Sequence, residues 1–129
     1  MENDLNINVL GEMVYSNNMD EKTILVNGTY KGYEIRVISY GTHPCCYIKL
    51  AEGHKYHGKE YDDIPLGVHG GLTFSDNVKR DERWSDGWWI GWDYSHFGDR
   101  YGNYVYGNEY STLELLEDLK CAVDELETL

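Results

Sequence analysis

The C-terminal segment restricts the possible folds of the chain more than any other stretch. Ser111 followed by Glu114 is the S-x-x-E pattern of a capping box, in which each side chain bonds the other residue's backbone amide. Apolar residues then recur at helical spacing, at Leu115, Leu116, Leu119, Ala122, Val123 and Leu126. This pattern predicts an amphipathic helix whose apolar stripe must be covered by another element.

The middle of the chain has the two-residue alternation of β-strands. Residues 23–40 show it most clearly, at Tyr33, Ile35 and Val37, and contain the turn candidates Asn27-Gly28 and Lys31-Gly32. Further strands are expected in C-C-Y-I-K-L-A and near residues 66–74, 88–94 and 104–106, with loops at 52–63 and 96–103. Residues 1–22 stay open, with a short strand or helix near Leu5 to Tyr15. We predict one domain, 1–129, with an α+β fold: a mainly antiparallel sheet with the C-terminal helix packed on one face.

Two adjacent cysteines are separated by the period of a strand. Cys46 shares a face with Ile48 and Leu50, whereas Cys45 lies on the other face. We therefore expect Cys46 to fill the core and Cys45 to be the freer thiol. The third cysteine, Cys121, lies in the helical pattern and is expected to be a small core residue.

The charge balance excludes some partners and favours others. Lys and Arg number 11 against 23 Asp and Glu, a formal net charge of -12. Direct binding to nucleic acid is disfavoured because phosphates would be repelled, whereas a basic protein surface would be attracted. No run of 18 apolar residues and no leader pattern is present, so we expect a cytoplasmic protein without a membrane span.

The predicted helix has an acidic outer face. Its carboxylates are Glu117, Asp118, Asp124 and Glu125. An acidic face is most often a solvated surface, and the alternative is a ridge that docks on a basic partner. We take these four residues as candidate partner-binding positions.

Two segments rich in Gly and Trp contain the candidate metal ligands. V-H-G-G-L-T-F and G-W-W-I-G-W-D-Y-S-H-F-G-D place imidazoles and carboxylates where a surface loop would carry other residues. Zn²⁺ takes Cys, His and carboxylate ligands, so we predict a zinc site formed by Cys45, His69, His96 and one of Asp93 or Asp99, with His43 and Cys46 in reserve. The alternative is that His69 and His96 are hydrogen-bonded structural residues.

The same motifs carry a resemblance. H-P-C at His43 to Cys45, H-G-G-L-T-F at His69 to Phe74 and W-W-I-G-W-D-Y-S-H-F-G-D at Trp88 to Asp99 resemble a family of small uncharacterised proteins of phages and prophages. The resemblance marks Cys45 as the motif cysteine. Family members often have Cys where this chain has Tyr94, so a zinc ligand at that position is not expected here.

The resemblance implies a function in the host cytoplasm. Phage proteins of this size often inhibit host defence, and an acidic, metal-binding inhibitor of Cas9 (an anti-CRISPR protein) would fit a basic nucleic-acid channel. One alternative is a small zinc hydrolase, although no catalytic signature is present and no catalytic residue is assigned. The other is a sponge for an anionic signalling nucleotide, with a basic pocket from Lys79, Arg80, Arg83 and Arg100.

Overall fold

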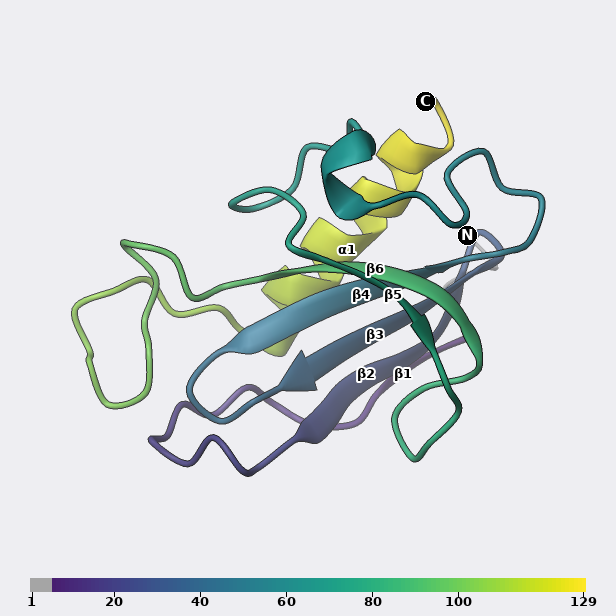
Figure 1. Cartoon of the computed structure of the whole chain (residues 1–129). Helices are drawn as coiled ribbons and strands as arrows, with labels where there is room; N and C mark the ends of the chain where they lie inside the picture. Colours follow the sequence, from purple (N-terminus) through teal and green to yellow (C-terminus); the bar gives the residue numbers. More distant parts are fainter. Residues whose placement is uncertain (1–5) are drawn as a thin grey trace.

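The computed structural model describes residues 6–129, which form an antiparallel sheet with an α-helix across one face (Figure 1). The six strands lie in the order β1-β2-β3-β4-β6-β5. Their bounds are β1 Ile7–Val9, β2 Thr23–Tyr30, β3 Tyr33–Ser39, β4 Pro44–Leu50, β5 Phe74–Val78 and β6 Gly87–Asp93. A short 3-10 helix, η2, spans Tyr61–Asp63, and the helix α1 spans Thr112–Leu126. The predicted α+β architecture is confirmed.

The helix begins where the capping box predicted. The Ser111 hydroxyl accepts from the Glu114 amide at 3.1 Å, and the Ser111 amide donates to a Glu114 carboxylate oxygen at 2.8 Å. The apolar stripe of α1 is buried against the sheet at Leu115, Leu119, Ala122, Val123 and Leu126. On the sheet side this core contains Ile35, Val37, Cys46, Ile48, Ile90 and Trp92.

The opposite face of the sheet carries a second, smaller cluster. Ile38, Cys45, Tyr47 and Trp89 are buried there, with Tyr40, Phe74, Val78 and Trp84 packed around them. Strand parity therefore separates the two cysteines as predicted, with Cys46 facing α1 and Cys45 facing away.

Cys45 is slightly more exposed than Cys46, as expected, whereas the predicted burial of Cys121 was wrong. Cys45 is buried, at 6% exposure, and burial raises the pKa of its thiol to about 12. Cys121, expected in the core, is exposed. Each helical residue turns by about 100°, which places Cys121 on the acidic face of α1, between Glu117 and Glu125 and away from the apolar stripe.

Three local expectations need correction. Asn27-Gly28 is not a turn: both residues lie within β2, and the turn is at Lys31-Gly32, where both φ angles are positive. Residues 66–73 form a loop instead of a strand, because Gly70 and Gly71 take positive φ angles, and β5 starts only at Phe74. Residues 104–106 belong to a turn-rich loop with an isolated bridge between Tyr101 and Tyr104.

The N-terminal region contains one short strand. β1 pairs with β2 and starts at Ile7, within the stretch where a strand or helix was left open. Leu5 lies outside the described residues. Between residues 6 and 129, no helix combines the length and apolarity that crossing a membrane requires.

Candidate functional site

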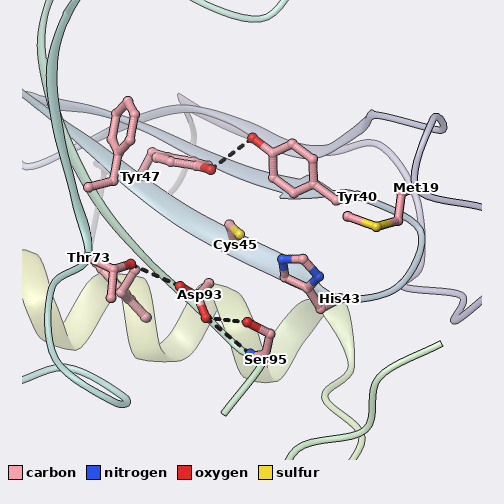
Figure 2. Close-up of a pocket in the computed structure, with 10 residues that line it drawn as sticks. Met19, Tyr40, His43, Cys45, Tyr47, Thr73, Asp93 and Ser95 are labelled. Atoms are coloured by element: carbon pink, nitrogen blue, oxygen red, sulfur yellow. Dashed lines mark hydrogen bonds between the residues drawn. The ribbon is translucent and has the colours of Figure 1, made fainter. Parts of the chain in front are cut away.

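A cavity of about 330 Å³ lies on the face of the sheet that α1 does not cover (Figure 2). Cys45 and Tyr47 on β4 and Phe74 on β5 contribute from that face. The remaining lining residues are Met19, Tyr40, His43, Thr73, Trp92, Asp93 and Ser95. A mostly apolar cavity of this size with a few polar groups is typical of a ligand-binding site.

One wall of the cavity is an aromatic arrangement around His43. The hydroxyls of Tyr40 and Tyr47 are hydrogen-bonded at 2.8 Å, as Figure 2 shows. The His43 ring stacks on Tyr40 at 5.8 Å and on Tyr101 at 5.4 Å between ring centroids. Burial lowers the pKa of His43 against the opposing effect of Asp93, so the imidazole is neutral at pH 7.

Asp93 is the single carboxylate among the lining residues, and no Lys or Arg lines the cavity in the described part of the chain. Its Oδ1 accepts from the Ser95 hydroxyl at 2.6 Å and amide at 3.2 Å, and its Oδ2 accepts from the Thr73 hydroxyl at 2.9 Å. Burial opposes ionisation, but these hydrogen bonds outweigh it and lower the pKa of Asp93. The cavity therefore contains a fixed negative charge.

The two motif histidines, His69 and His96, are each paired with a carboxylate near the cavity. His69 Nε2 lies 2.8 Å from Asp99 Oδ2, and His96 Nε2 lies 3.4 Å from Asp93 Oδ1. Asp99 is buried and also accepts from the His96 amide at 3.0 Å and the Tyr110 hydroxyl at 2.9 Å. Asp99 thus ties together the loops that carry the two histidines.

Gly70 of the H-G-G motif allows these loops to approach each other. A Cβ atom at Gly70 would lie 2.2 Å from His96 Nε2, and the residue has φ +69°. Gly71 also has a positive φ, but nothing lies within 4 Å of its Cβ position. The first glycine of the pair is therefore required by packing as well as by conformation.

The predicted zinc ligands are brought together only in part. His69, His96, Asp93 and Asp99 form the two pairs described above, and the His69 and His96 ring centroids are 5.7 Å apart. Cys45 lies opposite Asp93 in the β4–β6 register, in the cavity. Residues 6–129 include no group of three or more His, Cys, Asp or Glu side chains placed to hold a metal ion. The zinc site stays a prediction.

The two reserve ligands lie apart from the paired histidines. His43 is in the aromatic wall of the cavity, and Cys46 is fully buried under α1. His96 Nε2 is buried and has no hydrogen-bond partner, although Asp93 Oδ1 lies 3.4 Å away. Among the buried nitrogens of the two histidines in the described chain, it is the one left without a hydrogen bond.

The acidic face of α1 is largely engaged within the molecule. Asp118 accepts from the Tyr94 hydroxyl at 2.8 Å, and Glu125 accepts from the Gly67 amide at 3.2 Å. Asp124 pairs with Lys31 at 2.6 Å. Glu117 is exposed. Three of the four predicted partner-binding carboxylates therefore help to hold α1 and its surroundings together.

Sequence reasoning missed part of the cavity. Met19, Tyr40, Thr73 and Ser95 were not singled out, although parity placed Tyr47 on the same face as Cys45. Met19 reaches the cavity from the loop before β2, where periodicity carries no signal, whereas Tyr40 directly follows β3 and continues the face of Ile38. The packing of Tyr101 on His43 depends on the path of a long loop, which short motifs do not specify.

Comparison with known proteins gives no match: no family model, no curated protein and no solved structure matches the chain. The function of the chain is therefore inferred from the geometry, burial and charge of the residues described above.

Proposed function

We propose that this chain acts by binding a partner protein, with the loop of residues 96–109 as the central contact. The loop extends beyond the sheet, where it is drawn in yellow-green in Figure 1. Its large exposed apolar side chains are Phe97, Tyr101, Tyr104, Val105 and Tyr106. Aromatic residues are enriched at protein interfaces, and exposed apolar patches mark interaction sites. The gathering of these side chains on one loop is the observation that carries the proposal.

The loop is held in place by hydrogen bonds to the rest of the domain. The Gly102 amide donates to the Thr42 carbonyl at 2.9 Å, and the Asn103 amide donates to Asn17 Oδ1 at 2.9 Å. Arg100 pairs with Glu109 at 2.7 Å across its base. A contact loop that is ordered before binding loses less conformational entropy on association, which favours affinity.

The charge of the chain selects a basic partner. A net charge of -12 accelerates association with a positive surface and opposes association with nucleic acid. The resemblance to phage proteins makes a host defence protein the first candidate, and Cas9 has a basic nucleic-acid channel. In this proposal the carboxylates of α1 contribute to long-range attraction, and the aromatic loop supplies the contact.

A zinc ion remains part of the proposal as a structural element. The unsatisfied Nε2 of His96, with Asp93 Oδ1 3.4 Å away, has the donor chemistry that zinc accepts. The bond between His69 and Asp99 is the kind of carboxylate contact that orients a histidine ligand. A bound ion would tie the two loops together and supply folding stability.

The two alternative functions have less support. A zinc hydrolase would need a carboxylate free to activate a zinc-bound water, and both candidates, Asp93 and Asp99, already accept hydrogen bonds from neighbouring protein groups. A nucleotide sponge would need basic residues in the cavity. Arg83 instead pairs with Asp81 at 3.2 Å, and Arg100 pairs with Glu109.

The proposal is tested by biolayer interferometry with guide-loaded Cas9 proteins from several bacteria, followed by a DNA-cleavage assay. We expect the native chain to bind at least one of them and to reduce cleavage. The double variant Phe97→Ser with Tyr106→Ser should bind at least about tenfold more weakly, because exposed aromatic anchors dominate interface energies.

The matched control is Leu113→Ser on α1. Leu113 is 65% exposed, so this change removes a comparable apolar side chain from a different surface and should leave binding unchanged. Absence of binding and inhibition across the panel would contradict the defence-inhibitor proposal. Equal binding by the native chain and the loop double variant would contradict the role of the loop.

A further inference from the structure

We propose that the cavity beside the contact loop binds the guanidinium group of an arginine side chain presented by the basic partner. This deepens the proposed function and rests on it for the source of the arginine. The chemical part, recognition of an alkylguanidinium group, depends only on the cavity.

The walls of the cavity suit a flat, weakly hydrated cation. Tyr40, Tyr47 and Phe74 contribute aromatic side chains from the face of the sheet that α1 does not cover, and Cys45 and Met19 are the sulfur-containing lining residues. Aromatic faces attract cations, and guanidinium stacks on them better than ammonium because it is planar and less strongly hydrated. The volume of about 330 Å³ leaves room for one side chain of this length.

The charges of the cavity select a cation over an anion. Asp93 is the single carboxylate among the lining residues, and the Ser95 and Thr73 hydroxyls hold its two oxygens in place by donating hydrogen bonds at 2.6 and 2.9 Å. His43, on the other wall, is hydrogen-bonded through Nδ1 to Thr42 Oγ1 at 2.9 Å and stacks on Tyr40 and Tyr101. An incoming guanidinium therefore meets one carboxylate and no Lys or Arg among the lining residues of the described chain.

The position of the cavity connects it to the contact loop. Tyr101 belongs to the loop and stacks on His43, and its hydroxyl donates to Met19 Sδ at 3.5 Å. Figure 2 shows His43 and Met19 on one side of the cavity, and Asp93 with Thr73 and Ser95 on another. A partner surface that contacts the loop is therefore close enough to place an arginine in the cavity.

The experiment is an NMR titration of the ¹⁵N-labelled chain with N-acetyl-L-arginine methylamide, run with and without EDTA to control for a bound metal. We expect saturable shifts at residues lining the cavity, with a dissociation constant on the order of millimolar, as for other ligands of this size. The citrulline analogue has nearly the same shape without the charge and should bind at least about tenfold more weakly. Equal affinities for the two probes, or no saturable shifts at the cavity, would overturn the proposal.

Two pairs of variants locate the effect. Asp93→Asn should weaken arginine binding at least about tenfold, whereas Asp62→Asn removes an equal charge from η2, outside the cavity, and should not. Met19→Lys places a cation at the rim and should also weaken binding, unlike Val14→Lys at another exposed apolar position. Met19 is 53% exposed, so this second variant keeps the test valid if Asp93→Asn does not fold. Unchanged binding by Met19→Lys would count against the assignment.

The loop double variant separates this proposal from the proposed function. Phe97→Ser with Tyr106→Ser changes residues that do not line the cavity, so it should keep its affinity for the arginine probe. Loss of Cas9 binding with retained probe binding supports both proposals. If the native chain binds the arginine probe but not Cas9, only the proposed partner is overturned. If it binds Cas9 but not the probe, only the proposed arginine site is overturned.

Discussion

The two faces of the sheet differ in what covers them. The face under α1 is closed by aliphatic side chains such as Leu115, Leu119 and Ile48, which are fully buried. The opposite face has a small aromatic cluster and a cavity, with Cys45 near its centre in Figure 2. Of the two adjacent cysteines, Cys46 lies on the face under α1 and Cys45 on the opposite face. The same strands therefore support a closed core on one side and an open cavity on the other, which we propose as a binding site.

The largest expected effect is on the closed face. Leu119→Ala leaves a cavity under α1 and should lower the free energy of unfolding by roughly 2–5 kcal/mol. Leu113→Ala on the exposed side of the same helix should change it by less than about 0.5 kcal/mol. Urea denaturation measures both. If Leu119→Ala cost no more than Leu113→Ala, the helix would not be covering the sheet as described.

The next effect concerns the loops behind the cavity. Gly70→Ala forces a Cβ atom against the His96 ring at a residue with φ +69°, and should cost roughly 2–4 kcal/mol. Gly71→Ala has a similar positive φ but open space, so only the conformational cost of about 1 kcal/mol is expected. Thermal unfolding compares the pair. Equal losses would show that Gly70 does not pack on His96.

A bound zinc ion should have a smaller but measurable effect on the same loops. We expect protein purified without a His tag to contain zinc, and chelation to lower its melting temperature, because a bound ion ties together the loops of His69 and His96. Elemental analysis before and after chelation verifies the metal content. Identical melting curves for the zinc-loaded and metal-free samples would contradict the zinc prediction.

The smallest effect distinguishes the three thiols without changing stability. Burial raises the pKa of Cys45 to about 12 and that of Cys46 well above its usual value, so both stay protonated at pH 8. Cys121 is exposed and should react first with Ellman's reagent. The folded protein should therefore show a fast phase of reaction with Ellman's reagent, and Cys121→Ser should abolish that phase. A fast phase that survives this substitution would show that Cys45 is more accessible than its burial indicates.

Periodicity and capping predicted the elements that depend on local sequence. The helix was predicted because Ser111 and Glu114 act within one turn, and the faces of β4 were predicted because Cys45 and Cys46 follow the two-residue repeat. The predictions for the turn-rich segments were wrong because those segments depend on contacts with other parts of the chain. Gly28 looked like a turn residue, yet pairing with Ile35 on β3 and with the more distant Ile7 on β1 keeps it in β2.

The site was predictable in its residue types but not in its partners. His69, His96, Asp93 and Asp99 do lie near one another, but as two imidazole–carboxylate pairs. Nothing in the sequence specifies which carboxylate meets which imidazole, because those contacts depend on how two loops pack. Cys45 was assigned by its chemical type, and the depth of its burial depends on strands and loops far away in the chain.

The most direct test of the account is hydrogen exchange of the chain with and without guide-loaded Cas9, resolved by region. The account predicts slower exchange in residues 96–109 and in the strand ends around the cavity, with α1 unchanged. Slowing confined to α1, or no slowing anywhere at saturating partner, would contradict the assignment of the aromatic loop and its cavity as the binding surface.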